Sequence, residues 1–379
     1  MGGVGSILSR AKAKLNFTAT DAEAAAGVAE PRRTLGLKDR ALYFRPLHRE
    51  ASSCRSLSTY NSWSAPSEAM CPICRNKDAS LVLCRATLGS AAEHALVECS
   101  NCGVRYLSPL PTLEELQSFY CASYYGKDWY KQQGWGAAFA RAVLRHRPAG
   151  KFLDVGCGLG YFIDGVRQQS AWEVYGVEFS ASAVAFARQE LGLEAHQGEL
   201  SDAKFPAAYF DYIQIRNVLE HVTDPMALLK ECRRVLKDSG TLQLFVPNGL
   251  VDSLDLISFY RSEDKPALSK SGHLFFFPKR TLLQMFAEVG LKLEMSHTFG
   301  IRKGLASMGF WPRLKDWKRH YVAKDHKAVE ENAKIVLANK KWRPDVYYTY
   351  RLRRMNARML PGMRKFGLDF ELFLKRAEG

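Results

Sequence analysis

The chain has 379 residues, of which 47% are hydrophobic, and a formal net charge of +15. This length is enough for two or three domains with a sizeable core. No stretch of 18 or more apolar residues occurs, which excludes an ordinary membrane-spanning helix. The nine cysteines are odd in number and follow no secretory signal with a cleavage site. We therefore expect a metal site in a reducing, cytoplasmic compartment rather than a disulfide framework.

Residues 1–69 are rich in small and polar residues and show no sustained hydrophobic period, which predicts a disordered extension. Arg10, Lys12 and Lys14 lie near its start with no acid before them, as in transit peptides. The opening "MGGVGS" also fits the loose pattern of N-myristoylation. The extension is therefore expected to be either a dispensable tail or a targeting segment.

Two CxxC pairs follow, Cys71 with Cys74 and Cys99 with Cys102, and two candidate strands, "SLVLCR" and "HALVECS", lie between them. Each CxxC turn presents two thiolates to one ion, and two such turns complete a tetrahedral site. We expect a zinc-ribbon-like module over residues 70–107. Its Zn2+ would be structural, because four protein ligands leave no open coordination position. The alternative is four free, structural cysteines.

The rest of the chain is predicted to be helical over residues 113–147 and then to alternate strands with helices. Strands are expected at 151–155, 173–179, 210–217, 241–248, 291–300 and 368–377, and helices at 161–169, 181–192, 224–240 and 279–290. For the helix over 224–240, Asp224 is a suitable N-cap, Pro225 suits the first turn and Gly240 can end it. This alternation predicts an α/β fold with a doubly wound, parallel sheet.

The stretch "KFLDVGCGLGYF" places three glycines where the first of these strands meets a helix. The spacing of Gly156, Gly158 and Gly160 is GxGxG, which differs from the GxGxxG of dinucleotide-binding folds. Glu178 ends the next strand and can accept hydrogen bonds from ribose hydroxyls. Asp154 would repel a phosphate but attract an ammonium group. S-adenosylmethionine has a ribose, an ammonium group and no phosphate, so it is the nucleotide that this pattern favours.

The stretches "LDVGCGLGYF", "VYGVEFS", "GELSDAKFPAAYFDYIQIRNVLEHVTDP" and "GHLFFFPKRTLLQMFAEVGL" resemble the motifs of class I S-adenosylmethionine-dependent methyltransferases. The branch that they resemble is that of the ubiquinone-biosynthesis O-methyltransferases. The cysteine module ending in "CGVRYLSPLPT" is similar to that of many bacterial methyltransferases, including some that act on sugars and secondary metabolites. The resemblance covers roughly residues 70–300 and the last strand. It implies a Rossmann-like, mostly parallel, seven-stranded sheet, and it does not specify the acceptor.

The resemblance also implies which residues bind the cofactor. The glycines let the backbone approach the methionine part, and acidic and aromatic side chains hold the ammonium, ribose and adenine. On the matching positions these are Gly156, Gly158, Gly160, Asn217 and Val218 at the methionine part, Asp154 at the ammonium, Glu178 at the ribose, and Phe179 and Glu199 at the adenine.

One position departs from the metal-binding members of that branch. Those enzymes resemble "ExxEH" where this chain has "NVLEH", so Asn217 replaces the first carboxylate. A catalytic divalent metal on Glu220 and His221 is therefore not expected. An oxygen nucleophile still needs a base, and His221 and His273 are the candidates. The alternative for each histidine is a structural role in packing or capping.

Residues 302–365 carry 18 Lys and Arg residues against five acids, interleaved with aromatic residues. Three interpretations stay open: a helical cap over the active site, a surface that lies on anionic lipid, and, least favoured, a nucleic-acid surface. The expected methyltransferase domain then consists of residues 108–301 together with 366–379, with this basic helical insertion between them.

We expect an enzyme that transfers a methyl group from S-adenosylmethionine to an oxygen of a small-molecule, sugar or lipid-linked acceptor. If the basic insertion lies on lipid, the enzyme would be peripheral on a membrane. The alternatives are a nucleic-acid methyltransferase and a non-catalytic scaffold that uses the cofactor fold only for binding. The intact glycine loop and Glu178 argue against the scaffold.

Overall fold

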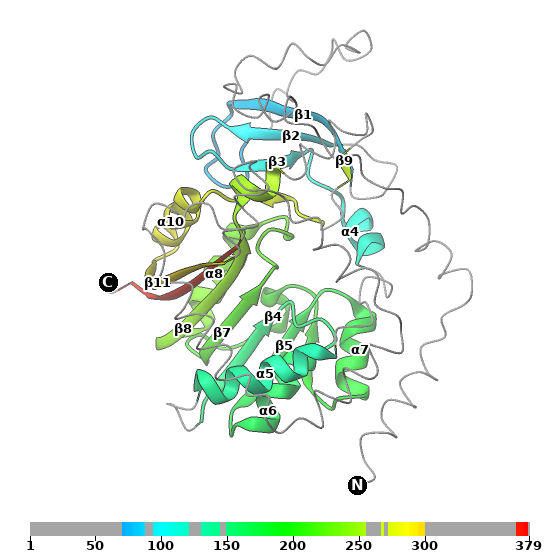
Figure 1. Ribbon diagram of the computed structural model, residues 1–379, viewed down its shortest axis with the longest axis vertical. Helices are drawn as coiled ribbons and strands as arrows, with labels where there is room; N and C mark the ends of the chain where they lie inside the picture. The colour runs from blue at the N-terminus through cyan, green and yellow to red at the C-terminus, as the bar shows by residue number, and fades with distance from the viewer. Residues whose placement is uncertain are drawn as a thin grey trace, which may run out of the picture.

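The computed structural model of the chain contains two β-sheets, one above the other in Figure 1. The residues that it describes are 70–87, 94–120, 130–144, 149–254, 267–268, 272–299 and 369–377. The predicted extension over 1–69 and the predicted basic insertion over 302–365 lie outside these residues. Within the described part of the chain, no helix is long and apolar enough to cross a membrane.

The larger sheet has seven strands in the order β11-β12-β8-β7-β4-β5-β6. The pairings among β8, β7, β4, β5 and β6 are parallel, and β12 pairs antiparallel with both β8 and β11. This confirms the expected mostly parallel, seven-stranded sheet. The strands are β4 (Lys151–Val155), β5 (Glu173–Glu178), β6 (Glu194–Gln197), β7 (Phe210–Arg216), β8 (Leu236–Pro247), β11 (Leu291–Phe299) and β12 (Asp369–Arg376).

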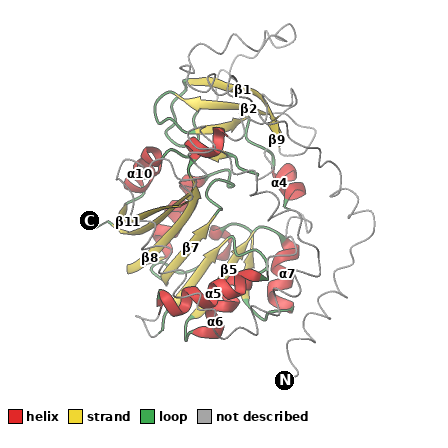
Figure 2. Ribbon diagram, in the orientation of Figure 1, coloured by secondary structure: helices red, strands yellow, loops and turns green. Residues whose placement is uncertain are grey.

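Apolar helices cover both faces of this sheet, because its central strands are hydrophobic on both sides. Along β4, Phe152 packs with one buried cluster and Leu153 with the other, as expected when successive side chains point to opposite faces. Figure 2 shows the helices around the sheet. The helices are α4 (Leu113–Phe119), α5 (Lys131–Ala142), α6 (Tyr161–Gln169), α7 (Ala181–Gln189), α8 (Pro225–Val235) and α10 (Lys279–Glu288), with a 3-10 turn, η5 (Leu200–Ala203).

The start of α8 matches the sequence prediction, but its end does not. The Asp224 side chain accepts a hydrogen bond from the Ala227 amide at 2.8 Å, and Pro225 occupies the first turn. The predicted end at Gly240 is wrong, because the helix stops at Val235 and Leu236 already has extended backbone angles. Leu236 is fully buried and pairs with Phe210 of β7, so sheet pairing begins where helix continuation was expected.

The smaller sheet combines the cysteine module with strands that come much later in the chain. Its order is β10-β3-β2-β1-β9. The module contributes β1 (Ala79–Thr87), β2 (His94–Cys99) and β3 (Arg105–Ser108), which confirms the two strands expected between the cysteine pairs. The outer strands are β9 (Ala267–Leu268) and β10 (Phe275–Phe276), which follow the larger sheet's β8. Residues 70–107 therefore do not complete this sheet by themselves.

Helices α5 and α6 approach so closely that two glycines replace side chains between them. A Cβ atom on Gly136 of α5 would lie 1.9 Å from the Phe162 carbonyl oxygen, and one on Gly165 of α6 would lie 2.0 Å from the Gln133 carbonyl oxygen. Both obstacles are backbone atoms, which cannot move aside as a side chain can. The glycines therefore permit this packing.

We expect Gly136→Ala to destabilise the protein by roughly 1–3 kcal/mol, the usual cost of overpacking a close contact. Gly134→Ala is the matched control in the same helix, because a Cβ atom on Gly134 would have no neighbour within 4 Å. The control should be neutral or stabilise the helix by up to about 1 kcal/mol. Denaturant unfolding measures both variants, and equal midpoints would contradict the close α5–α6 packing.

Candidate active site

The loops that follow β4, β5, β6 and β7 lie along one edge of the larger sheet. These strands are parallel and in register, with Val155 of β4 beside Val177 of β5 and Ile215 of β7. Glu178 of β5 lies beside Gln197 of β6. The structure therefore brings the predicted cofactor residues to a common edge, where open α/β sheets usually bind their ligands.

The glycine loop after β4 has a backbone that favours glycine. Gly156, Gly158 and Gly160 have φ angles of 74°, 56° and 80°, which other residues rarely adopt. A Cβ atom on Gly156 would lie 2.3 Å from Cγ2 of Val218, so the loop after β7 presses directly against it. Gly160 forms the N-cap of α6. At its three glycines the loop thus presents bare backbone, without side chains, at the start of a helix.

Glu178 braces this loop from the end of β5. One carboxylate oxygen accepts a hydrogen bond from the Gly158 amide at 2.8 Å, and the other accepts one from the Ser180 amide at 2.9 Å. The side chain is largely buried, and each oxygen can accept more than one hydrogen bond. Glu178 is therefore held in a fixed position by two backbone amides.

Asp154 lies inside β4, buried, and accepts a hydrogen bond from the Gln214 amide at 3.0 Å. Burial raises the pKa of Asp154 to about 6, against the opposing effects of Gln214 and the Arg216 charge. Arg216 ends β7 and was not singled out from the sequence. Its guanidinium donates to Gln214 at 3.2 Å and lies 4.8 Å from the centre of the Phe162 ring. The signal that could have revealed it is a lone cation two residues after a buried Gln on a central strand.

The remaining predicted cofactor residues also lie at this edge. Phe179 is half-buried beside Glu178 and packs against the core. Glu199 is exposed and caps η5, where its amide donates to Asp202 at 2.8 Å. Asn217 is exposed with a φ of 51°, and its amide donates to the Phe245 carbonyl. Val218 touches the glycine loop, as described.

The two candidate bases lie together just beyond Val218. The ring centres of His221 and His273 are 4.8 Å apart. Nε2 of His221 is 3.6 Å from a carboxylate oxygen of Glu220, and Nε2 of His273 is 3.9 Å from the same oxygen. Within the described residues, neither Glu220 oxygen has a hydrogen-bond partner, and the side chain is almost fully buried. The sequence pairs Glu220 with His221 as neighbours, but it does not predict that His273 joins them.

The two histidines differ in their other contacts. Nδ1 of His273 lies 2.6 Å from a carboxylate oxygen of Asp252, so it donates a hydrogen bond to an acid. Nδ1 of His221 lies 2.7 Å from the Tyr120 hydroxyl and 3.1 Å from the Gly272 carbonyl oxygen. Asp252 and Tyr120 were also missed from the sequence, because each comes from a distant segment and carries no motif of its own.

Burial and neighbouring charges shift the pKa values of the cluster in opposite directions. Burial is the main reason that the pKa of His221 falls to about 3, with the nearby His273 adding to the effect. Burial also raises the pKa of Glu220 to about 7. The pKa of His273 is raised because the attraction of Asp252, Glu220 and Asp369 outweighs burial. His221 is therefore neutral at physiological pH, whereas the pKa of Glu220 lies near that range.

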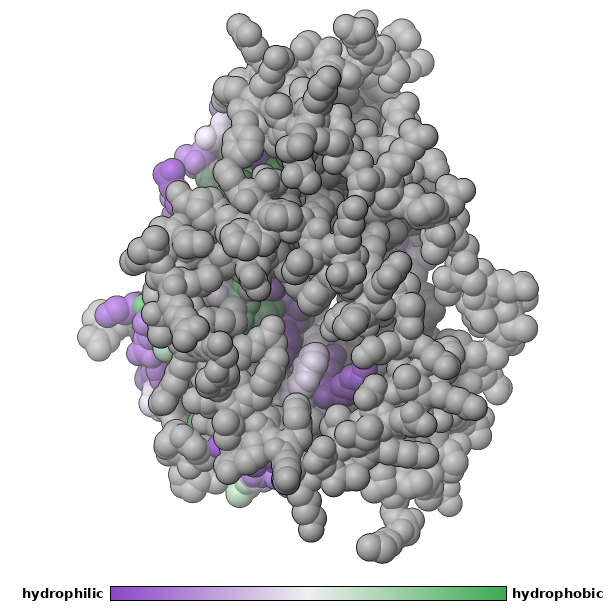
Figure 3. Space-filling model, viewed as in Figure 1, coloured by the Kyte–Doolittle hydropathy of each residue, from purple (hydrophilic) through white to green (hydrophobic). Residues whose placement is uncertain are grey.

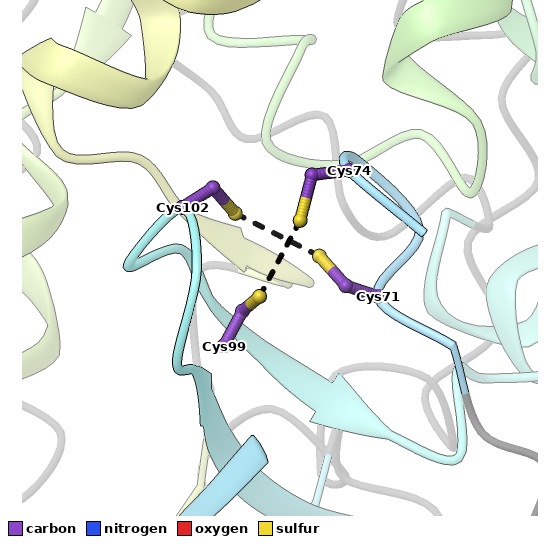
Figure 4. A group of neighbouring side chains, drawn as sticks. All are labelled: Cys71, Cys74, Cys99 and Cys102. Atoms are coloured by element: carbon purple, nitrogen blue, oxygen red, sulfur yellow. Dashed lines mark hydrogen bonds between the residues drawn. The ribbon is translucent and has the colours of Figure 1, made fainter. Parts of the chain in front are cut away.

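The four predicted metal ligands form a second cluster, in which the thiols point toward one another (Figure 4). The Sγ atoms of Cys71 and Cys102 are 3.7 Å apart, those of Cys74 and Cys99 are 3.5 Å apart, and all four lie within 4.8 Å of one another. A tetrahedral site with Zn–S bonds of about 2.3 Å requires S–S separations of roughly 3.8 Å. The geometry therefore fits one metal ion.

The thiols also have the chemistry that a metal requires. A hydrogen bond with the Cys102 thiol lowers the pKa of Cys71 to about 5, whereas burial raises the pKa of Cys99. An ion that bound here would take thiolates and would compensate for the burial of Cys71, Cys99 and Cys102.

Comparison with known proteins identifies the family. A family model described as "Methyltransferase domain" matches residues 129–295. A ubiquinone biosynthesis O-methyltransferase of Histophilus somni is 34% identical over 192 residues, which cover 47% of this chain and 79% of that protein. A Mycobacterium tuberculosis protein named "Probable S-adenosylmethionine-dependent methyltransferase" is 34% identical over 102 residues, 27% of this chain and 37% of that protein. The chain thus spans little more than a third of that relative.

Among solved structures, an S-adenosylmethionine-dependent methyltransferase from Archaeoglobus fulgidus aligns with 66% of this chain and 97% of its own, at 18% identity and a TM-score of 0.39. The matched family domain includes the glycine loop, Glu178 and the segment with Glu220 and His221. The Histophilus relative, of which this chain covers 79%, and the matched methyltransferase domain together show that the chain belongs to the class I S-adenosylmethionine-dependent methyltransferases.

Proposed function

We propose that the chain transfers a methyl group from S-adenosylmethionine to an oxygen atom of a small-molecule, sugar or lipid-linked acceptor, with His273 as the base. The observation that carries the proposal is the position of the His273 cluster. It lies just beyond Val218, which touches the glycine loop, so a cofactor held by the loop would have a proton acceptor nearby. The relatives named ubiquinone biosynthesis O-methyltransferases favour oxygen as the acceptor atom.

Three charged residues suit the ends of this cofactor. Two backbone amides hold the Glu178 carboxylate in place, where it would accept hydrogen bonds from the ribose hydroxyls. Asp154, buried beside the glycine loop, would gain a cationic partner in the ammonium group. Arg216 lies on the same side of the sheet as Asp154 through Gln214 and would face the carboxylate of the methionine part. Paired charges of this kind offset the cost of burying each one alone.

Gly158→Asp is expected to abolish S-adenosylmethionine binding, because its side chain would fill the ligand's place and add a negative charge beside Glu178. Glu178→Ala should weaken binding by roughly 1–3 kcal/mol, the cost of unpaired hydrogen-bonding groups. Glu173→Ala is the control at the opposite end of β5, where the side chain is 61% exposed. Calorimetry measures all three affinities. Unchanged affinity in both site variants, or binding of NAD instead, would refute this cofactor site.

The arrangement favours His273 over His221 as the base. Asp252 fixes the Nδ1 proton of His273, which leaves Nε2 to accept the proton of an acceptor hydroxyl. Glu220, next to Nε2, would stabilise the imidazolium that forms. His221 instead has a pKa of about 3 and makes a poor base at neutral pH. Its contacts with Tyr120 and Gly272 suit a structural role instead.

The cofactor, when bound, would supply a methyl group on its sulfonium sulfur. The acceptor oxygen would take this methyl group by displacing the sulfur in line. The chain's own contribution is to align the oxygen, exclude water and receive its proton on His273. In that transfer S-adenosylhomocysteine would be the leaving group, as a neutral thioether. The hydroxyl proton ends on His273, and the reaction needs no further reagent.

The test is to incubate a cell extract with the protein and methyl-labelled cofactor, and to search for labelled products by mass spectrometry. With an acceptor found, the rate should fall as the pH drops through the raised pKa of His273, because only neutral imidazole accepts a proton. Asp252→Asn should shift this fall to lower pH and slow the reaction, since burial then dominates the pKa of His273. His273→Gln should remove most of the rate while cofactor affinity stays unchanged.

Two outcomes would contradict this mechanism. If no labelled product forms in any extract while the cofactor binds, the chain is a binding scaffold. If His273→Gln methylates as fast as the wild type, another group is the base.

We further propose that the cysteine cluster holds one structural zinc ion. The support is the S–S spacing and the burial of Cys71, Cys99 and Cys102. With four protein ligands, the site has no position for substrate. Free thiols and a thiolate metal site both suit a reducing compartment, which favours a cytoplasmic location.

Metal analysis of the purified protein should find about one zinc ion per chain. The double variant Cys71→Ser, Cys74→Ser should lose the metal and unfold at a lower temperature, while cofactor affinity changes little. Cys232→Ser is the control, because this buried cysteine of α8 lies outside the cluster. A full zinc content in the double variant would refute the ligand set.

A further inference from the structure

Arg105 of the cysteine module reaches out of its own sheet toward the His273 cluster. It lies on β3 and is 7% exposed. Its guanidinium donates to Glu98 Oε2 at 2.6 Å and to Ser253 Oγ at 2.9 Å. Ser253 comes 148 positions later in the chain, so this contact joins the module to the segment that follows β8.

Ser253 is the immediate neighbour of Asp252, the acid that holds His273. Ser253 is fully buried, and its hydroxyl also donates to the Gly249 carbonyl at 2.6 Å. With Arg105 on one side and Gly249 on the other, Ser253 cannot rotate without losing a buried hydrogen bond. The backbone that adjoins Asp252 is therefore tied to the position of the guanidinium.

The backbone of β3 holds the other partner of this pair. Arg105 pairs with Phe276 and Tyr106 with Phe275 of β10, and the Leu107 amide donates to the Leu274 carbonyl at 3.0 Å. Leu274 follows His273 directly. One short strand of the module, β3, thus contacts both the segment that carries His273 and the segment that carries Asp252.

We propose that Arg105 is a positioning residue that holds Asp252 against His273, so that the cysteine module sets the reactivity of the base. The catalytic consequence rests on the proposed function, whereas the positioning itself does not. A planar guanidinium suits this task, because it can donate to Glu98 and Ser253 at once in a fixed geometry. A lysine ammonium could reach one of them well but not both.

The effect of Arg105 can be read from the pKa of His273. The charged groups that face His273 are Asp252, Glu220 and Asp369, and the neighbouring ring is that of His221. Asp252 is hydrogen-bonded to Nδ1 of His273 at 2.6 Å. If Asp252 moves away, the largest remaining influence is burial, which lowers the pKa of a histidine.

The experiment is a histidine titration by nuclear magnetic resonance on the isotope-labelled full chain, with the His273 signal assigned from His273→Gln. Arg105→Met should lower the pKa of His273 by roughly one pH unit, the size of the effect of a lost neighbouring charge. Ser253→Ala removes only the contacted hydroxyl and should lower it in the same direction. Arg105→Lys should fall between Arg105→Met and the wild type.

Arg234→Met is the matched control, because Arg234 also binds a carboxylate and a backbone carbonyl, those of Glu231 and Phe205, but on α8. It should leave the pKa of His273 unchanged. The proposal is overturned if Arg105→Met and Ser253→Ala titrate like the control. If Arg105→Met does not fold, Ser253→Ala alone decides. A shifted His273 in an enzyme that His273→Gln does not impair would uphold the positioning role and refute the base.

Discussion

The backbone of residues 272–277 is hydrogen-bonded to both parts of the molecule, and the arrangement of the candidate active site depends on it. The Leu274 and Phe275 amides donate to the Glu220 carbonyl at 2.8 and 3.2 Å, and Glu220 follows β7 of the parallel sheet. The same segment accepts the Leu107 amide and pairs with β3 of the smaller sheet. These bonds leave His273 with little freedom and place it beside Glu220 at the junction of the two sheets. On the face drawn in Figure 3, coloured hydrophilic and hydrophobic residues lie side by side near the middle of the molecule.

Buried charge is the second constraint, and the proposed ligands answer it. Asp154, Glu178 and Glu220 are all carboxylates removed from water, which is costly unless each finds donors or cations. Glu178 has two backbone amides, and Asp154 has one amide donor and the charge of Arg216. Within the described residues the Glu220 carboxylate has no hydrogen-bond partner, and its burial raises its pKa to about 7. Buried ionisable groups that lack hydrogen-bond or charge partners are where bound ligands and proton transfer are expected.

Much of this structure could be predicted from local patterns in the sequence. The glycine loop, Glu178, the cysteine pairs and the alternation of strands and helices are all set by residues close together in the chain, and the structure places them as expected. The end of α8 was mispredicted because the pairing of Leu236 with Phe210 outweighs the signal of Gly240. Asp252, Tyr120 and Arg105 were missed for the same kind of reason. Their roles come from partners more than 20 positions away, such as His273 for Asp252 and Ser253 for Arg105.

In the proposed arrangement, one cofactor held by the glycine loop faces an acceptor side built jointly by the two sheets. A crystal structure of the full chain with S-adenosylhomocysteine tests it most directly. We expect the ribose hydroxyls to bind Glu178 and the sulfur atom to face His273 and Glu220. A ligand bound away from the glycine loop, or one whose sulfur points away from His273, would contradict it.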